Sequence, residues 1–553
     1  MPSPLAALAL QAYRNGRPAE AAAHCRAILQ TAPSDLGALQ MLGAIAQTAG
    51  RLDEALSWAE RAVAVAPDNP AGLAALGALR LQRGEAEAAL AVLERASARA
   101  PRDAALHNSR ASALQAIGRF ADALRAYDKA LASGPPHREA LLQRGHVLMA
   151  LDEPAQALAA YNRLLALDPG QARALFAQGN ALLALRRPAD AVESFRRTLA
   201  AEPGHAAAAN NLAIALQRLG RDDEALQLYD RILSRAAPED PAHFGRAQIH
   251  LAHGRFSMGW DDYRARHSVR DQRSLLFQGR LPDSLAGERL WLRKDQGIGD
   301  ELFFLRFAPD LKRRGARLVY QSGAKIAALV RRLQVADEVI DEDAPIPDAA
   351  TVLSIGDLPY ALGHRDDGAV AGSLALAPLP ARLAEMAARL EALGPAPYIG
   401  VTWRAGTAEH GGLHKDLPHR GLAKALSPVP GTFLSLQRLP QADETAAFQQ
   451  ALGRPAADFS QLNDNLEGML ALLALLDDYI CVSNTNVHLR ALAGKPSRVL
   501  VPLPAEWRWM AAGDESPWFP GTRIYRQTAD GDWQGAFRDL TGDLEAVFNR
   551  RRP

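Results

Sequence analysis

The stretch that decides the fold is GRLDEALSWAERAVAVAPDNPAGLAALGALRLQR, residues 50–83, because its landmarks recur along half of the chain. Four series of residues share a period of 34, and this stretch carries one member of each. The series are Gly16, Gly50, Gly84, Gly118, Gly220 and Gly254, with Asp152 and Arg186 in the gaps; Pro33, Pro67, Pro101, Pro135, Pro169 and Pro203; Ala55, Ala89, Ala123, Ala157, Ala191 and Ala225; and Gly43, Gly77, Ala111, Gly145, Gly179 and Ala213. Four series in one register indicate a repeated structural unit.

Each series has a physical reason in a helical hairpin. The first glycines lie where the chain leaves one helix for the next, and a positive φ there is cheap only for glycine. The prolines end the second helix of each unit, because proline donates no backbone hydrogen bond. The small residues of the other two series lie where paired helices cross, since larger side chains would push the backbones apart. The first half is therefore predicted to be a stack of helical hairpins.

A period of 34 residues is that of the tetratricopeptide (TPR) repeat, and residues 2–239 resemble seven such repeats. A degenerate eighth, HFGRAQIHLAHGRFSMGWDDYRARH, follows at residues 243–267. Its Trp260 and Tyr263 are bulkier than the usual small residues, so we expect this terminal repeat to pack on something else. The resemblance implies a solenoid over residues 1–270 that holds other proteins.

Amide side chains on the first helices predict a groove on the concave wall of the solenoid. The candidate acceptor-binding residues are Asn108, His146, Asn180, Asn210 and Asn211, with Gln40, Gln47, Gln115 and Gln217 beside them. Such a groove suits a peptide backbone or a partner helix. The alternative is a solvated helix face. The TPR domain of O-GlcNAc transferase has one asparagine at the same position of each repeat. That regular series is absent here, because the matching positions read Met41, Ala75, Ser109, Gln143, Ala177 and Asn211.

After about residue 270 the repeat stops and short β-rich runs alternate with helical stretches, which predicts parallel sheets with crossover helices. The expected strands are residues 288–294, 317–322, 338–342 and 351–356, then 398–404, 432–437, 479–483 and 497–502. Leu466–Val482 is expected to be a buried helix that runs into a strand. Two Rossmann-like halves, 271–394 and 395–553, should then face a crevice. Ligands bind beyond the carboxyl ends of such strands, so we expect the site on the loops after Lys294, Arg404, Gln437, Ser483 and Pro502.

The motif Gly297-Ile298-Gly299-Asp300 follows the first of these strands and opens a helix. Two glycines there let the backbone turn sharply and present amides to an anion or a sugar oxygen. Asp300 at that position could accept a proton from an attacking hydroxyl, with Glu301 as the second choice. The alternative is a tight strand–helix turn in which Asp300 only caps the helix.

LRKDQGIGDELFFLRFAPDLKRRGARLVYQ resembles the opening of the heptosyltransferase-like glycosyltransferases, which have a G-x-G-D turn and the GT-B fold. The tail agrees: HLRALAGKP from His488, VLVP from Val499, EWRW from Glu506 and SPWFP from Ser516 are similar to TPR-fused members of that family. The likeness covers about residues 243–530. It implies a metal-independent transferase of GT-B fold that needs no cofactor beyond its nucleotide-sugar co-substrate.

The resemblance also implies roles for particular residues. Asp300 matches the catalytic base, and Gly297 and Gly299 form the donor-binding turn. The other residues that it places at the donor, several of them near its phosphates, are Trp403, Arg404, Lys415, Ser483, Asn484, Thr485 and His488. Ser483 stands where the family usually has Asp, and Arg490 replaces a small residue. A gained cation would suit an anionic sugar, such as a CMP-linked nonulosonic acid. The alternative is that Arg490 reaches solvent from its helix.

Other residues give weaker signals. Asp341, Glu342 and Asp343 imitate a metal-binding triplet but fit a strand end, and His410, His414 and His419 would need a further ligand to hold zinc. Trp507, Trp509 and Trp518 could stack on a base or sugar, although burial against the sheet is the commoner fate.

The TPR–transferase arrangement resembles the flagellin glycosyltransferases of some bacteria. We therefore expect a protein O-glycosyltransferase that recruits its acceptor, with flagellin as the candidate, and transfers a sugar to Ser or Thr. The alternatives are a non-catalytic scaffold with a degenerate GT-B domain and a transferase that acts on a glycan or lipid.

The bulk composition is that of an ordinary globular protein. The 553 residues are 48% hydrophobic and 23% charged, with a net charge of +1, so nothing points to nucleic acid. The two cysteines, Cys25 and Cys481, cannot build a disulfide framework. No apolar run is long enough to span a membrane, and no secretory leader is evident at the start, so a cytoplasmic location is expected.

Overall fold

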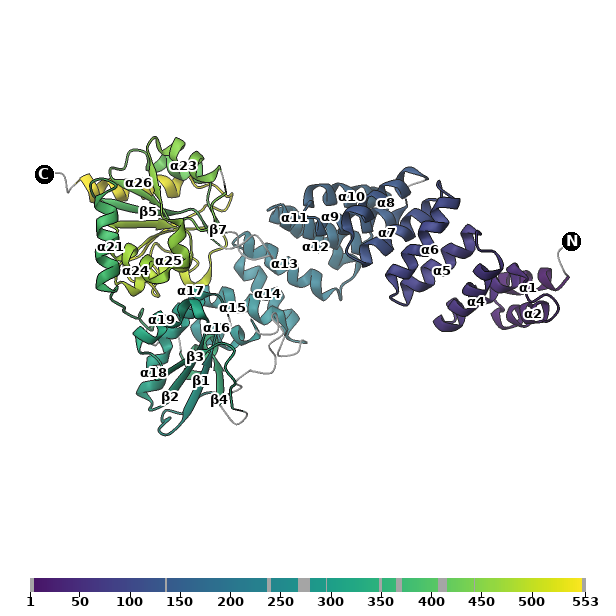
Figure 1. The fold of residues 1–553 in the computed structure, drawn as a ribbon, viewed down its shortest axis with the longest axis horizontal. Coiled ribbons are helices and arrows are strands. Elements are labelled where there is room, and N and C mark those ends of the chain that lie inside the picture. The colour runs from purple at the N-terminus through teal and green to yellow at the C-terminus, as the bar shows by residue number, and fades with distance from the viewer. Residues whose placement is uncertain are drawn as a thin grey trace. The chain divides into compact units, whose positions relative to one another are not determined.

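The computed structural model describes residues 4–134, 137–235, 240–266, 279–294, 296–347, 351–364, 370–405, 415–441 and 443–549. The chain divides into two compact units, Met1–Asn211 and Leu212–Pro553 (Figure 1). The first unit is a helical TPR solenoid, and the second joins the last repeats to an α/β region. The predicted fold class, a solenoid followed by parallel sheets with helices, is therefore confirmed.

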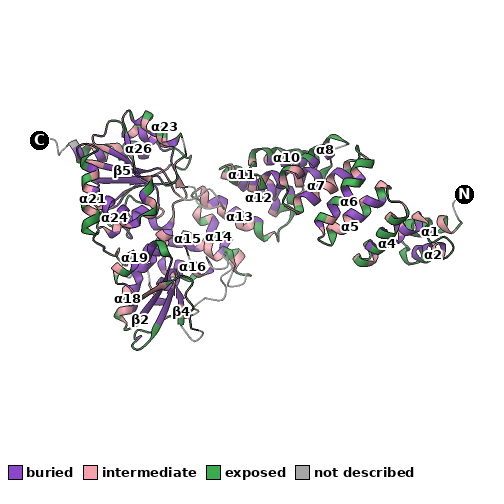
Figure 2. Ribbon diagram, in the orientation of Figure 1, coloured by how far each residue is buried: buried purple, intermediate pink, exposed green. Residues whose placement is uncertain are grey.

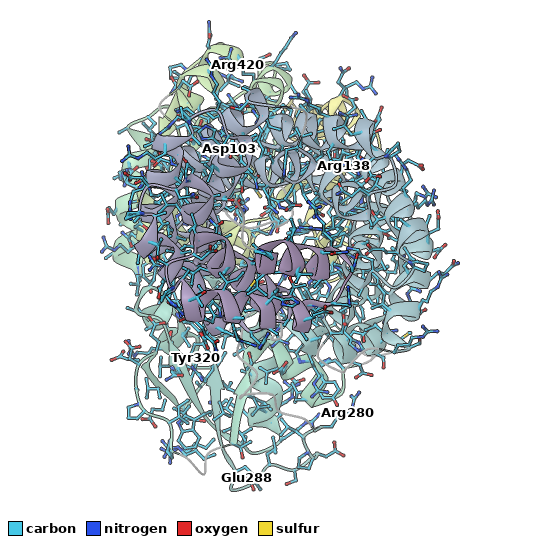
Figure 3. All side chains as sticks on the ribbon, turned by 90° about the vertical axis from the view of Figure 1, so that its right-hand side faces the viewer. Asp103, Arg138, Arg280, Glu288, Tyr320 and Arg420 are labelled. Atoms are coloured by element: carbon cyan, nitrogen blue, oxygen red, sulfur yellow. The ribbon has the colours of Figure 1, made fainter. Side chains whose placement is uncertain are left out.

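The solenoid consists of helical hairpins, each made of a first and a second helix that run antiparallel. Its helices are α1 (Pro4–Arg14), α2 (Pro18–Thr31), α3 (Leu36–Thr48), α4 (Leu52–Val65), α5 (Pro70–Gln82), α6 (Ala86–Arg99), α7 (Ala104–Ala116), α8 (Phe120–Ala132), α9 (Arg138–Ala150), α10 (Pro154–Leu167), α11 (Ala172–Ala184), α12 (Pro188–Ala201) and α13 (Ala206–Arg218). First helices begin at polar caps: Asp103, for example, accepts hydrogen bonds from the backbone N–H groups of Ala105 and Leu106 and lies on the surface (Figure 3).

The residues between paired helices have the predicted left-handed backbone. Gly16, Gly50, Gly84 and Gly118 have φ between 68° and 86°. Asp152 and Arg186, which fill the two gaps in the glycine series, have φ of 59° and 57°. The turn therefore imposes this conformation even where a side chain makes it costly. Pro135 lies outside the described residues, whereas the five other prolines of the series follow the second helices closely.

The small residues of the other two series sit at helix crossings, as predicted. The alanines from Ala55 to Ala225 are fully buried. A Cβ built on Gly145 would lie 2.2 Å from Cε1 of Tyr161, and one on Gly179 would lie 2.5 Å from Cε1 of Phe195. Those glycines are therefore required because an aromatic ring of the second helix occupies the space.

The second unit begins with the last repeats and continues into two sheets. Its first helices are α14 (Asp222–Leu233), α15 (Pro241–Ala252) and α16 (Phe256–Tyr263). The next segment holds β1 (Arg289–Arg293), α17 (Ile298–Phe304), α18 (Ala308–Arg313), β2 (Arg317–Ser322), α19 (Ala324–Leu333), β3 (Glu338–Asp341), β4 (Thr351–Ser354) and α20 (Leu358–Leu362). The last holds α21 (Pro380–Glu391), β5 (Tyr398–Thr402), β6 (Arg404–Ala405), β7 (Lys415–Asp416), α22 (His419–Leu426), β8 (Thr432–Ser435), α23 (Glu444–Leu452), β9 (Ala456–Asp458), α24 (Leu466–Leu475), β10 (Asp478–Cys481), α25 (Thr485–Leu492), β11 (Arg498–Val501), β12 (Arg523–Arg526) and α26 (Gln534–Asn549).

Both large sheets are parallel and have Rossmann-type strand orders. The first sheet runs β3-β2-β1-β4, and the second runs β12-β11-β10-β5-β8-β9. The order reverses beside the first strand of each sheet: between β1 and β4 in one, between β5 and β10 in the other. Crevices open beyond the strand ends at such points. The central strands of both sheets are largely buried between covering helices (Figure 2), whereas the edge strand β3 has no buried residue.

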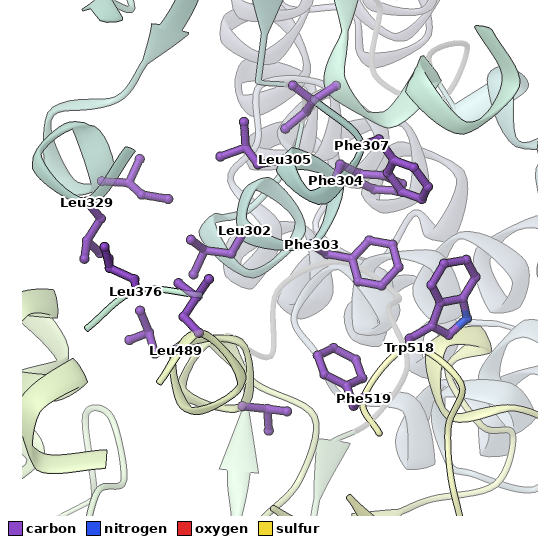
Figure 4. Close-up of a cluster of buried hydrophobic side chains, with 14 of the residues drawn as sticks. Leu302, Phe303, Phe304, Leu305, Phe307, Leu329, Leu376, Leu489, Trp518 and Phe519 are labelled. Atoms are coloured by element: carbon purple, nitrogen blue, oxygen red, sulfur yellow. The ribbon is translucent and has the colours of Figure 1, made fainter. Parts of the chain in front are cut away.

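One hydrophobic core runs from the last repeat into the α/β region, within the second unit. Trp260 of α16 is 2% exposed, and its ring centroid lies 5.2 Å from that of Trp507 and 6.3 Å from that of Phe304. Figure 4 shows Phe303 and Phe304 of α17 near Trp518, Phe519 and Leu489 in the same core. The expectation that Trp260 and Tyr263 pack on something else is confirmed. The compact unit consequently begins at Leu212, well before residue 270, where the sequence changes its pattern.

Candidate functional site

The first helices after β1 and β10 meet at their N-terminal ends. A Cβ built on Gly299 would lie 3.3 Å from Cδ2 of His488 and 3.7 Å from Cα of Thr485. The absence of a side chain at Gly299 thus allows α17 to approach α25 closely. This contact brings together four of the predicted site residues, Gly299, Asp300, Thr485 and His488, from the carboxyl ends of the two sheets.

Charged side chains form a continuous chain across this junction. Arg508 Nη2 donates to Asp300 Oδ1 at 2.5 Å, and its Nη1 donates to Glu506 Oε1. The other oxygen of that carboxylate, Oε2, accepts from Lys415 Nζ at 2.7 Å and from Ser483 Oγ at 2.8 Å. We call these five residues the junction network. Three of them, Asp300, Lys415 and Ser483, were predicted site residues.

Two members of the junction network, Glu506 and Arg508, are held in their charged forms by their neighbours. Burial opposes ionisation of Glu506, but Lys415 and Arg508 outweigh burial and lower the pKa of its carboxyl group. Burial likewise opposes charge on Arg508, whereas Asp300 and Glu506 raise the pKa of its guanidinium. The Asp300 side chain remains 27% exposed, while Arg508 is 5% exposed. Among the described residues Asp300 Oδ2 has no hydrogen-bond partner, so this oxygen is available to a hydroxyl that enters the junction.

A small pocket adjoins the network at the carboxyl ends of β10 and β11. It is lined by Lys415, Ser483, Leu500, Val501, Pro502, Pro504, Glu506 and Trp509. The loops after Ser483 and Pro502, which the sequence analysis named, both contribute to it. Lys415 reaches this place because β7 turns back and pairs with β6, where Ala405 is opposite Lys415.

His488 lies behind the network in an aromatic cage. Its ring centroid is 5.2 Å from that of Phe519 and 6.2 Å from that of Phe303. Burial, followed by the charges of Arg508 and Arg306, lowers the pKa of the imidazole well below its ordinary value, so the ring is neutral at pH 7. Its Nδ1 has no hydrogen-bond partner in the part of the chain that the structure describes.

Trp403 and Arg404 do not join the network, because their side chains bind partners elsewhere. The Trp403 indole is buried and stacks on Phe448 at a centroid distance of 4.8 Å. Arg404 donates to both oxygens of Glu444, at 3.2 Å and 3.0 Å. These side chains point to partners on α23 that a strand position alone does not reveal.

Arg490 also lies away from the junction, which corrects both sequence interpretations of it. The residue is 1% exposed, so it neither faces a ligand nor reaches solvent. Its guanidinium donates to the backbone carbonyls of Pro496 at 2.6 Å and Leu473 at 2.7 Å. Arg490 therefore caps the carboxyl end of α24, and the argument for an anionic sugar that rested on this residue falls.

The remaining predicted residues have mainly structural contacts. Gly297 precedes α17 with extended backbone, and Asn484 caps α25 by accepting from the Val487 N–H at 3.2 Å. Glu301 is buried and accepts from the Tyr320 hydroxyl at 2.6 Å, which removes it from the junction. Trp507, Trp509 and Trp518 are buried in the core, the commoner fate that the sequence analysis gave them.

The five candidate acceptor-binding residues lie on first helices of the solenoid and are half-buried, whereas Gln47 is exposed. Asn211 of α13 donates to Asn180 of α11 at 2.8 Å, and Asn210 donates to Asn211 at 3.4 Å. His146 Nδ1 lies 3.3 Å from Gln143 Oε1, and the buried Asn108 Oδ1 has no partner among the described residues. Amides of successive repeats thus bind one another in part, and a partner would have to compete with those bonds.

The described residues contain no group of three or more His, Cys, Asp or Glu side chains that could hold a metal ion. His410 and His414 lie outside the described residues. Glu342 pairs with Lys294 instead of forming an open triplet with its neighbours. Within the described ranges, every helix is too short or too polar to cross a membrane.

Glu506 and Arg508 are the site residues that sequence reasoning missed. Both belong to the EWRW stretch that carried the family resemblance, but no role was given to either. Their signal was position: the turn follows the loop after Pro502, beyond the carboxyl end of β11. Charged residues at that edge of a parallel sheet are themselves candidates for ligand contact.

Protein-family models support the repeats directly. Tetratricopeptide repeat models match residues 12–79, 46–113, 109–172, 142–189 and 176–241. Solved TPR proteins from Parabacteroides merdae and Thermus thermophilus match the chain at 19% and 26% identity, with TM-scores of 0.35 and 0.28. They cover 43% and 33% of this chain and 94% and 98% of their own.

In addition to these models, the chain is similar to one curated bacterial protein. Protein FlbA of Caulobacter vibrioides is 28% identical over an alignment of 331 residues, and the match covers 54% of this chain and 54% of FlbA. The chain therefore spans about half the length of this relative in the match. The class that fold and comparisons define is a TPR protein with an attached α/β region, similar in part to FlbA.

Proposed function

We propose that this chain is a cytoplasmic, metal-independent protein O-glycosyltransferase. The TPR solenoid recruits a protein acceptor, and the α/β region acts as a GT-B transferase on a nucleotide sugar. The observation that carries the proposal is the open carboxylate oxygen of Asp300, which lies where the carboxyl ends of both sheets meet. The resemblance to TPR-fused glycosyltransferases supplies the reaction class.

In the proposed reaction Asp300 accepts the proton of a Ser or Thr hydroxyl as its oxygen attacks the anomeric carbon. The bond from that carbon to the nucleotide phosphate breaks, and the leaving phosphate takes the electron pair. Lys415 and Arg508 lie close enough to the junction to stabilise the phosphate charge, which a metal ion would otherwise do. Ser483, at the turn into α25, would fix the donor beside them.

The junction network also weakens the scaffold alternative. That alternative rested on Ser483, which stands where the family usually has a carboxylate. Glu506 Oε2 lies 2.8 Å from Ser483 Oγ, so a carboxylate is supplied from a different turn. A degenerate domain would have no reason to keep this group beside Asp300, Lys415 and Arg508.

The solenoid supports the partner half of the proposal. TPR repeats are protein-binding scaffolds, and the amides from Asn108 to Asn211 suit a peptide or a helix. We propose flagellin as the acceptor and a CMP-linked nonulosonic acid as the donor. The support is the resemblance to flagellin glycosyltransferases, since Arg490 no longer bears on the sugar.

The test is transfer to flagellin measured by intact mass. The purified chain is incubated with flagellin and a CMP-linked nonulosonic acid, and a mass gain of whole sugar units is expected. Asp300→Asn should lower the rate by about a hundredfold or more, because a general base contributes at least that much. The matched control is Asp310→Asn, an ion-paired carboxylate of α18 outside the junction, which should transfer normally.

Two outcomes would reject parts of the proposal. Flagellin that binds without gaining mass from any nucleotide sugar would favour the scaffold. Transfer to a glycan or lipid extract, with flagellin unchanged, would favour the other transferase alternative. Equal rates for the chain with Asp300 and the Asn variant would remove Asp300 as the base.

A further inference from the structure

The Glu506 carboxylate is held in a pocket built for an oxyanion. Its two oxygens are bound by three donors from three separate segments: Lys415 on β7, Ser483 after β10, and Arg508 on its own turn. A compact ammonium, a guanidinium fork and a hydroxyl together form a common recognition set for carboxylate and phosphate groups. The Glu506 carboxylate therefore shows how this pocket binds an anion, although here the anion belongs to the protein itself.

We propose that this pocket is an oxyanion-binding site of the substrate, and that Glu506 is its internal occupant, exchanged for an anionic group when the substrate binds. The inference rests on the proposed function for the identity of that substrate. The shared chemistry is an oxyanion with two or three acceptor oxygens. A nucleotide phosphate and the carboxylate of a nonulosonic acid both provide it.

The pattern of exposure supports an exchange at the Lys415 side. The Lys415 side chain is 30% exposed, whereas Glu506 is 11% and Arg508 is 5% exposed. Lys415 thus stands at the rim, where it lines the small pocket together with Pro502, Pro504 and Trp509. An anion can reach the ammonium from solvent before it meets the guanidinium.

The charge balance supports the same conclusion. The network contains two cations, Lys415 and Arg508, and two carboxylates, Asp300 and Glu506. If Glu506 leaves, Arg508 keeps Asp300 as a partner, but Lys415 loses the one carboxylate that it contacts among the described residues. The unpaired positive charge then lies on Lys415 at the rim, where an incoming anion can neutralise it in place of Glu506.

The exchange predicts that removing the charge of Glu506 improves anion binding. Glu506→Gln keeps the size of the side chain but no longer competes as an anion. In the full chain, calorimetric titration should show about tenfold tighter binding of the anion that uses the pocket. Three probes separate the sources: CMP carries only a phosphate, N-acetylneuraminic acid carries only a carboxylate, and cytidine carries neither.

Cytidine should bind equally to the original chain and to Glu506→Gln. The matched control is Glu467→Gln on α24, which breaks an ion pair with Arg332 of α19 away from the pocket. It should leave the affinity for every probe unchanged. Lys415→Gln should lower the affinity for the same anion about tenfold, both in the original chain and in Glu506→Gln.

Unchanged or weaker anion binding by Glu506→Gln would overturn the inference, because Glu506 would then be only a structural partner. Equal tightening for cytidine would overturn it as well. If Glu506→Gln does not fold, judged by far-ultraviolet circular dichroism, Lys415→Gln decides alone: unchanged anion affinity rejects the pocket. Absence of sugar transfer together with the predicted change in CMP affinity would reject the proposed function and leave the pocket standing.

Discussion

Arg490 is a buried cation that has no carboxylate at hydrogen-bond distance among the residues that the structure describes. The acceptors of its guanidinium are backbone carbonyls: those of Leu473, Leu476 and Asp477 at the carboxyl end of α24, and that of Pro496 in the following loop. The last carbonyls of a helix have no partner within the helix and attract positive charge. Burial lowers the pKa of this guanidinium, which shows that the interior partly opposes the charge that the carbonyls need.

Replacing Arg490 by Met should therefore lower stability and leave the site unaffected. We expect a loss of about 3 kcal/mol, because several buried carbonyls lose their donor. Urea unfolding monitored by tryptophan fluorescence measures this loss. The control is Arg420→Met on α22, an exposed residue labelled in Figure 3, which should change stability by less than about 0.5 kcal/mol. Equal losses in the two variants, or weaker binding of CMP to the folded Arg490→Met chain, would contradict this role.

Particular residues show how far a site can be predicted from sequence. Asp300 was placed correctly at the carboxyl edge of its sheet, because a strand, a glycine turn and a helix follow one another locally. Trp403 was placed at the right edge, but its indole turns to Phe448, 45 positions further along the chain. The direction of a side chain depends on partners that only the tertiary fold brings near. Glu506 was overlooked for the same reason, since its three donors come from distant positions.

At the scale of elements, the repeated helices were far easier to predict than the sheets. Eight expected strands correspond to observed ones, and Leu466–Val482 is a helix followed by a strand. Neither β9 nor β12 was among the predicted strands. The first is only Ala456–Asp458, without β-branched residues, and the second, Arg523–Arg526, carries arginines at both ends. Pairing at a sheet edge decides such strands more than their own composition does.

The repeats permit a sharp test of helix packing, because equivalent glycines differ in their surroundings. A Cβ on Gly145 would meet the Tyr161 ring at 2.2 Å, whereas one on Gly43 would find its nearest atom at 3.7 Å. Gly145→Ala should therefore destabilise the solenoid by about 2 kcal/mol or more through overpacking. Gly43→Ala should be neutral or slightly stabilising, because alanine favours a helix. Thermal unfolding of the two variants gives the comparison, and equal midpoints would refute the steric explanation of this glycine series.

At the scale of the whole molecule, the change in sequence pattern and the change in packing occur at different places. The 34-residue pattern continues to the last repeat, but the second compact unit already begins at Leu212. The reason is that α16 and the residues directly after it pack against the α/β region through both apolar and charged side chains. Trp260 packs on Trp507, and Arg266 donates to Asp357 at 2.7 Å beside the carboxyl end of β4. The last repeat therefore completes the α/β core, which a domain boundary drawn from sequence periodicity cannot show.

Truncation at the two boundaries should accordingly give different products. A chain that starts at His205, just before α13, keeps the contacts of Trp260, Tyr263 and Arg266 and should unfold in one cooperative transition. A chain that starts after Arg266 exposes the rings of Trp507 and Trp518, so it should melt at least 10 °C lower or bind a hydrophobic dye such as ANS.

Within the longer chain, Trp260→Ala should cost about 3 kcal/mol or more. Met258→Ala on the same helix, at a side chain 54% exposed, should cost almost nothing. Scanning calorimetry measures all four, and equal melting temperatures for the two truncated chains would show that the last repeat is dispensable to the α/β core.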